Sequence, residues 1–169
     1  IYPILCTRDL VLFPTVLTPI ILGRSQSVAV LEHFQQQKKG EAIFCAFAQK
    51  DSDEENPTQE DLYEIGVFCR LIKMIDLPGQ EGQTTIVAQG LGRCKLNKIT
   101  QSVPFYEGEV ESVSEGWPEK DDAEFALLQQ TLRAQTIQLI HACEDMPNEA
   151  EYALNNVSSP LVRPNFVFS

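Results

Sequence analysis

The side chains that could carry nucleophilic or metal chemistry are few in this chain and are widely spaced. There are two histidines, His33 and His141, and neither belongs to an H-E-x-x-H pattern of the kind that holds zinc. No two of the five cysteines form a C-x-x-C pair, and no nearby histidine marks a serine or cysteine as a nucleophile. We therefore predict no catalytic residue, no metal site and no cofactor in this chain.

The cysteines themselves are predicted to be buried thiols. Cys45 lies in the run IFCAF and Cys69 in GVFCRLI, where a thiol packs as a small hydrophobic group. The other three are Cys6, Cys94 and Cys143, so the total is odd. An odd number without paired spacing is typical of a reducing compartment, and we expect a cytoplasmic protein.

Two further segments have some features of ligand-binding sites, but their sequences indicate a structural role without a bound ligand. QGLGRCKL, residues 89–96, has two glycines near an arginine, yet it lacks the strand-to-helix context of a phosphate-binding loop. We predict a glycine-marked β-bulge there. The acidic stretch KDSDEENPTQED, residues 50–61, lacks the ligand order of an EF-hand, so we predict a solvated loop without calcium.

Length and composition set the class of protein. The chain has 169 residues, enough for one domain or for one domain with a small appendage. Its 43% apolar and 22% charged residues are typical of a globular protein with a real core. The formal net charge is −11 and the basic residues are scattered, which disfavours nucleic acid and anionic membranes as main partners.

Periodicity in the first two-thirds of the chain predicts a small, curled β-domain over residues 1–116. Residues 42–48 are almost continuously apolar, as in a strand that is covered on both faces. Residues 63–77 alternate like a strand whose pattern slips near Ile72, which indicates a bulge. Another strand is predicted over residues 84–99.

One helix and one further strand complete the predicted β-domain. The helix is capped by Ser25 and ended by Gly40, and its buried face consists of Val28, Leu31 and Phe34. Residues 105–113, FYEGEVESV, alternate carboxylates with other residues. We predict that Glu107, Glu109 and Glu111 form the exposed face of an edge strand, where charge blocks unwanted pairing.

After residue 116 the apolar period changes from two to about 3.6, which predicts a helical subdomain over residues 117–169. A second helix is predicted from Pro147, with a break at 158–160. Because the chain begins at Ile1 and its helical part looks unfinished, we expect a piece of a longer protein. The first helix is predicted to turn one stripe toward a packed interior, formed by Phe125, Leu128, Leu132, Thr136, Leu139 and Cys143.

The opening segment RDLVLFPTVLTPIILGRS, residues 8–25, is apolar and contains two prolines. It is too short to span a membrane. We expect Arg8 and Asp9 to hold the entry of the chain by an ion pair or by capping. Pro14 and Pro19 would keep the following strand irregular and hard to pair at its edge. Either the whole run is core, or part of it remains an exposed patch.

The residues of three segments resemble the amino-terminal domain of the ATP-dependent protease Lon. They are PILCTRDLVLFPTVLTPIILGRSQSVAVLEHF, AQKDSDEENPTQEDLYEIGVFCRLIKMIDLPG and VAQGLGRCKL. The first carries the Arg8-Asp9 pair, the Phe-Pro and the Gly-Arg of the family pattern. Cys6 and Thr7 depart from the Pro-Leu that usually precedes this pair, and Pro164 interrupts a place where family members start another helix.

The resemblance implies an α+β fold: a PUA-like six-stranded pseudo-barrel β-domain with one packed helix, followed by a helical subdomain. It implies a non-catalytic module that binds unfolded, damaged or degron-bearing polypeptides for a cytoplasmic, homo-hexameric protease. ATP and magnesium, and a Ser-Lys catalytic pair, would belong to other parts of that protein. The alternatives are a stand-alone substrate receptor or adaptor and, disfavoured by the charge, an RNA-binding protein.

The candidate substrate contacts are apolar residues for which burial is hard to arrange. Apolar contact is not directional, so an exposed patch suits a receptor that accepts many sequences. The acidic surface would add a preference for basic segments that weakens with salt. We expect polypeptides to contact Leu12, Phe13 and Val16 of the opening segment, and Leu77 and Pro78 of the IDLPG turn.

Overall fold

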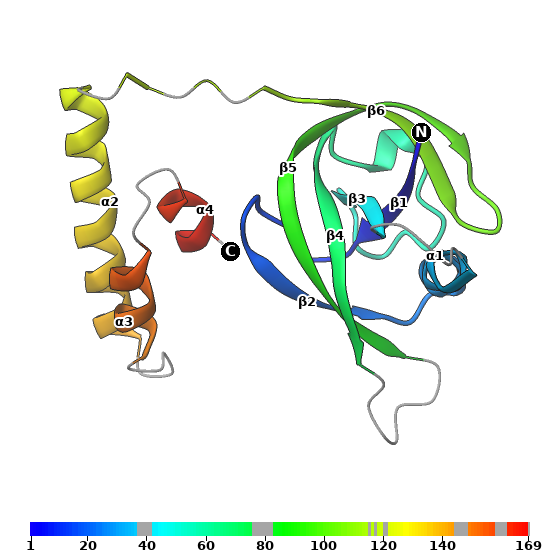
Figure 1. Ribbon diagram of the computed structural model, residues 1–169, viewed down its shortest axis with the longest axis horizontal. Helices are drawn as coiled ribbons and strands as arrows, with labels where there is room; N and C mark the ends of the chain where they lie inside the picture. Colours follow the sequence, from blue (N-terminus) through cyan, green and yellow to red (C-terminus); the bar gives the residue numbers. More distant parts are fainter. Residues whose placement is uncertain are drawn as a thin grey trace. The chain divides into compact units, whose positions relative to one another are not determined.

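The chain forms two compact units, Ile1–Ser114 and Glu115–Ser169. The computed structural model describes residues 1–169 except 37–41, 76–82, 115, 117, 120–121, 144–148, 158–161 and 169. Among these residues, the first unit contains all the strands and one α-helix, and the second contains three α-helices (Figure 1). Within the described part of the chain, no helix is long and apolar enough to span a membrane.

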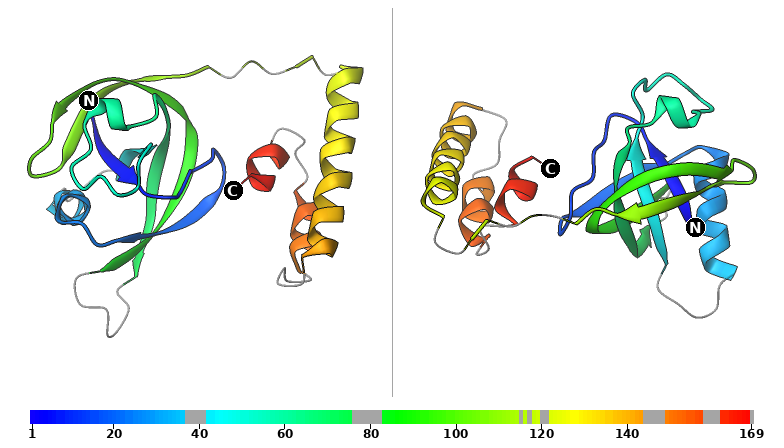
Figure 2. Two further views of the ribbon diagram at one scale, coloured as in Figure 1. Left: turned by 180° about the vertical axis from the view of Figure 1, so that it is seen from behind. Right: turned by 90° about the horizontal axis from the view of Figure 1, so that it is seen from above.

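Six strands of the first unit form one mixed sheet that curls into a ring (Figures 1 and 2). The order is β2-β5-β4-β3-β1-β6, and a further pairing of β5 with β6 closes the ring. β1 and β3 are parallel, and the other pairs are antiparallel. This confirms the predicted pseudo-barrel. The strands are β1 (Tyr2–Thr7), β2 (Leu17–Leu22), β3 (Ile43–Ala48), β4 (Ile65–Ile75), β5 (Thr84–Gln101) and β6 (Tyr106–Ser112).

The core lies on both faces of β3, as its continuous apolar sequence predicts. Phe44 and Ala46 belong to a cluster that also contains Leu31 of helix α1 (Ser25–Gln36). Cys45 and Phe47 belong to a second cluster on the other face, with residues of β1, β5 and β6. α1 therefore covers one of the two clusters, while its predicted end at Gly40 lies outside the described residues.

Two register shifts in the β4–β5 pair confirm the predicted bulges. One lies between Leu71 and Lys73, where the sequence pattern slips at Ile72. The other lies where Phe68 pairs with Gly92 and Cys69 with Gly90, so that Leu91 is the extra residue. The GLG sequence therefore continues as strand, as predicted, and each bulge bends and twists the long strands that form the ring.

The prediction for β6 as an edge strand was wrong. β6 pairs with β1 through Tyr106 to Gly108 and with β5 along its length. Closure of the ring places β6 between β5 and β1. β1 lies at the start of the chain, far from β6 in sequence, so the local pattern of β6 cannot show that pairing. One face of β6 is still exposed to solvent, because Glu109 and Glu111 are exposed.

β2 is the strand at the end of the sheet order, and Pro19 lies in its middle. The N–H of Gly90 donates to Val16 O at 3.0 Å, just before β2 begins. In an antiparallel pair only alternate residues bond to the partner, so the backbone groups of residues 17, 19 and 21 point away from β5. Pro19 thus lacks an N–H on the outer edge, and its effect on pairing there stays a prediction. The strand itself is regular, contrary to the prediction, and Pro14 lies before it.

The second unit consists of α2 (Ala123–Ala142), α3 (Glu149–Asn156) and α4 (Arg163–Val167). Asp122 caps α2, because its carboxylate accepts a bond from the N–H of Phe125 at 2.9 Å. Pro164 lies in the first turn of α4, where proline is tolerated. Pro147 lies outside the described residues.

The predicted core stripe of α2 was wrong in part. Leu128 and Leu139 are 60% and 59% exposed, and Cys143 is exposed as well, while Phe125, Leu132 and Thr136 are half-buried. The buried position of this helix is Gln129. The physical reason is that a polar residue faces the interior of this unit, so the apolar period does not follow the packed face.

Candidate polypeptide-binding site

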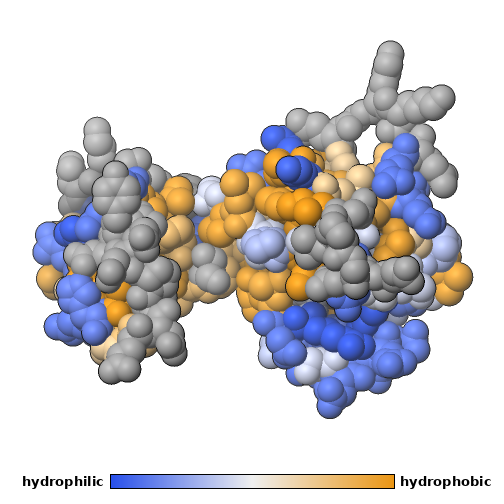
Figure 3. All heavy atoms as spheres, turned by 90° about the horizontal axis from the view of Figure 1, so that it is seen from below, coloured by the Kyte–Doolittle hydropathy of each residue, from blue (hydrophilic) through white to orange (hydrophobic). Residues whose placement is uncertain are grey.

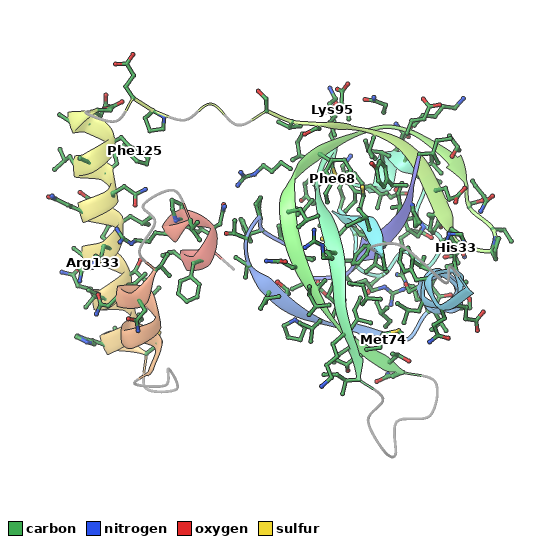
Figure 4. All side chains as sticks on the ribbon, in the orientation of Figure 1. His33, Phe68, Met74, Lys95, Phe125 and Arg133 are labelled. Carbon is green, nitrogen blue, oxygen red and sulfur yellow. The ribbon has the colours of Figure 1, made fainter. Side chains whose placement is uncertain are left out.

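The two histidines lie apart from each other, in different units of the chain. The ring of His33 lies 5.0 Å from that of Phe105 and 5.8 Å from that of Phe34, so it packs with aromatic side chains at α1 (Figure 4). His141 lies on α2, in the other unit. Among the residues that the structure describes, no group of His, Cys, Asp or Glu side chains is placed to hold a metal ion.

The thiols fall into two groups. Cys45, Cys69 and Cys94 are buried, as predicted, whereas Cys6 is half-buried and Cys143 is exposed, contrary to the prediction. Burial raises the pKa of Cys69 to about 12 and that of Cys6 to about 12. The thiol of Cys94 raises the pKa of Cys45 as its hydrogen-bond partner. A protonated thiol is a poor nucleophile, so these buried side chains act as core residues.

The acidic stretch is ordered by its own side chains and backbone. The carboxylate of Asp61 accepts bonds from the hydroxyl of Thr58 at 2.6 Å and from its N–H at 2.8 Å, which lower the pKa of Asp61. Lys50 Nζ donates to Glu60 O at 2.6 Å. Most of the carboxylates in this stretch are exposed, so it is the predicted solvated loop, although Pro57 is buried.

The opening segment contributes both core and surface. Leu12 is 5% exposed and belongs to the core cluster, so its side chain is not presented at the surface as the contact hypothesis requires. Phe13 and Val16 are half-buried, and the binding role of these two stays a prediction. Leu77 and Pro78 lie outside the described residues.

The exposed apolar side chains of this region belong to β2 instead. Leu17 and Ile21 are 57% and 65% exposed, and Pro19 between them is exposed too, while Ile20 and Leu22 point into the core. We call Leu17, Pro19 and Ile21 the β2 row. Hydrophobic residues gather on the face of the β-unit seen from below in Figure 3, beside hydrophilic ones. The alternation within LTPIIL was the sequence signal for this row, and the long apolar run concealed it.

A recess of about 580 Å³ lies beside the β2 row. Its walls come from the end of β1, the chain that follows β1, the second half of β2 and the start of α1. Pro19 and Ile21 belong both to the row and to the wall of the recess, so the two features are continuous. Arg8, Leu10 and Arg24 line the recess together with these two residues.

Arg24 is the best-anchored side chain of the recess. Its Nη1 donates to Gln49 Oε1 at 2.6 Å, and its Nη2 donates to the backbone oxygen of Glu54 at 2.7 Å. Gln49 Nε2 donates to the same Glu54 oxygen at 2.9 Å. Arg8 Nη2 reaches that oxygen more weakly, at 3.5 Å. Burial, and then the charge of Arg8, lower the pKa of Arg24.

Arg8 and Asp9 do not form the ion pair that was expected to hold the entry of the chain. Among the described residues, the guanidinium of Arg8 contacts a backbone oxygen and no carboxylate. Asp9 and Thr15 instead have positive φ values, 50° and 70°, and turn the chain at either end of the intervening segment. The hydroxyl of Thr7 donates to Leu10 O at 2.7 Å and fixes the first of these turns.

Curated relatives support one assignment. The chain is 32% identical over 164 residues to the Lon protease of Parabacteroides distasonis. The aligned part is 97% of this chain and 19% of that protein. The chain is 34% identical over 166 residues to the Lon protease of Porphyromonas gingivalis, again covering 97% of this chain and 19% of the relative. The chain thus spans about a fifth of the length of these relatives.

Two solved structures share the fold. The N-terminal domain of the Mycobacterium avium complex Lon protease superposes with a TM-score of 0.55 at 17% identity, covering 99% of this chain and 95% of that one. A Lon N-terminal domain protein from Xanthomonas campestris gives 0.52 at 12% identity, with 99% and 96% covered. The family model for the ATP-dependent protease La (LON) substrate-binding domain matches residues 1–166. The chain therefore belongs to the family of Lon substrate-binding domains.

Proposed function

We propose that this chain is the substrate-recognition module of a Lon-type ATP-dependent protease and binds unfolded or degron-bearing polypeptides. The observation that carries the proposal is the β2 row, where bulky apolar side chains are exposed to solvent on the outer strand of the sheet. Contact with such side chains removes apolar surface from water on both partners and does not depend on one sequence. The half-buried Phe13 and Val16 lead into this row and extend the proposed surface.

The module has no chemical step of its own in this proposal. ATP hydrolysis with magnesium and peptide cleavage by a Ser-Lys pair would take place in other domains of a cytoplasmic homo-hexamer. The alternative is a receptor of the same fold that is not fused to a protease. The downstream reading frame discriminates between these: a phosphate-binding loop followed by a Ser-Lys protease domain supports the first, and an early stop codon the second.

Binding to a permanently unfolded, fluorescent client protein tests the apolar surface. Ile21→Ser should weaken binding about fivefold or more, because it removes a large exposed aliphatic side chain from the contact. Its thermal midpoint should hardly change, since the side chain is already 65% exposed. Val103→Ser is the control: this residue is 75% exposed and lies in the connection between β5 and β6. Equal binding by both variants would remove the β2 row from the proposal.

A further inference from the structure

The recess beside β2 concentrates positive charge in a chain whose formal net charge is −11. Arg8 and Arg24 both line it, and the oxygens that accept their bonds are neutral: the side-chain amide of Gln49 and the backbone of Glu54. Among the described residues neither guanidinium forms an ion pair, and the distant carboxylate of Glu55 offsets the charge of Arg24 only weakly. The mutual repulsion of two guanidiniums would be relieved by an anion between them.

Both guanidiniums have donors to spare. A guanidinium carries five N–H groups in a planar fork, and two nitrogen atoms of Arg24 and one of Arg8 are engaged in the bonds described above. A carboxylate matches such a fork with two parallel bonds. The rest of the wall is mixed: the polar Thr7, Ser27 and Gln83 line it together with apolar side chains that include Leu10 and Ile21. The volume of about 580 Å³ is that of a site for a small molecule or a short peptide end.

The outer edge of β2 limits what kind of chain can enter. Leu17 and Ile21 present backbone groups to this edge, but Pro19 between them has no N–H to offer. A long strand therefore cannot add continuously along β2, whereas the last few residues of a chain can bond beside Ile21 and turn into the recess. A chain end also brings its own carboxylate.

We propose that the recess binds the C-terminal carboxylate of an unfolded polypeptide, with Arg8 and Arg24 as its ligands. Leu10 and Ile21 contact the apolar side chain of the last residue. The inference rests on the proposed function and gives it a substrate class: polypeptides with an exposed, apolar C-terminal end.

Fluorescence anisotropy with the full chain tests this with three short unfolded peptides that end in leucine. The first has a free C-terminal carboxylate, the second a C-terminal amide, and the third an amide end and one internal glutamate. We expect the amide to weaken binding about fivefold to tenfold, since charge-assisted bonds are lost. Arg8→Gln should remove that difference without lowering the thermal midpoint, because its described bond is 3.5 Å long.

Lys98→Gln is the matched control, since it removes the same charge from an exposed position on the part of β5 that pairs with β6. This variant should retain the preference for the free carboxylate. Equal binding of acid and amide overturns the inference, and so does full recovery of binding by the internal glutamate. Ile21→Ser separates the two proposals. If the acid and amide peptides bind equally and this variant weakens the binding of both, only the carboxylate site fails. If the variant weakens the binding of neither peptide, the proposed function fails.

Discussion

Two glycines of β5, separated by one residue, have opposite surroundings. A Cβ atom on Gly90 would lie 2.1 Å from the backbone oxygen of Phe13, whereas one on Gly92 would meet nothing within 4 Å. Gly90 also exchanges backbone bonds with the opening segment: Thr15 N–H donates to Gly90 O at 2.9 Å. The close approach of two backbones at Gly90 therefore joins the segment before β2 to the ring.

Gly90→Ala should consequently destabilise the protein by about 1–3 kcal/mol or more, because neither backbone can move away without breaking these bonds. Gly92→Ala should stay within about 0.5 kcal/mol of the parent. Urea denaturation of the two variants measures both values. A similar loss in the two would show that the bulge itself, and not the contact with Phe13, requires glycine.

The buried thiols give stability a pH dependence of defined sign. Burial raises the pKa of Cys69 to about 12, while a thiol of the unfolded chain titrates at about 8.5. Between these values the unfolded state loses a proton that the folded state keeps. The free energy of unfolding therefore falls as pH rises, by about 1.4 kcal/mol per pH unit for each such thiol.

Unfolding in urea under reducing conditions, at about pH 8 and about pH 10, measures this slope. Cys69→Ala removes one of the titrating groups, so its stability should fall less steeply over the same interval, whatever its starting stability. If the slope of this variant equals that of the parent, the thiol of Cys69 does not contribute to the pH dependence.

At the scale of elements, local patterns predicted the burial of β3 and the bulge at Ile72, but they predicted neither the packed face of α2 nor the pairing of β6 with β1. The run of β3 and the slip at Ile72 report which side chains are covered, and both were predicted correctly. Closure of the ring by β6 depends on strands far apart in sequence, which alternation within β6 cannot show. The candidate site shares this limit: the exposure of Leu17 and Ile21 could be predicted from alternation, but the meeting of Arg8 with Arg24 depends on tertiary packing.

α2 and α3 provide an element-scale test of the packed face in the second unit. Arg133 of α2 donates to Asn155 Oδ1 of α3 at 2.6 Å, and Leu154 of α3 is 1% exposed (Figure 4). Leu154→Ala should lower the free energy of unfolding of this unit by about 2–5 kcal/mol. Leu128→Ala should change it by no more than about 0.5 kcal/mol. The loss of helical circular dichroism in urea measures both, and a larger effect at Leu128 would place the packed face elsewhere.

At the scale of the whole molecule, the β-unit has apolar clusters made of its own residues. Both apolar clusters of the β-unit consist of residues from the first 110 positions of the chain, and the strands that enclose them are all present there. The described residues that form the recess and the β2 row belong to this unit as well. Folding and polypeptide binding should therefore both be properties of residues 1–114.

A fragment of residues 1–114 should unfold cooperatively, with a thermal midpoint within about 4 °C of the corresponding transition in the full chain, because it contains every residue of both apolar clusters. The fragment should bind the unfolded client as tightly as the full chain does, and Ile21→Ser should weaken both to the same degree. Phe44→Ala in the fragment is the control for the transition, since loss of this buried ring should cost about 3–5 kcal/mol. A fragment that melts without cooperativity would mean that the helical unit completes the β-unit, and a folded fragment without affinity would move the binding surface to the helices.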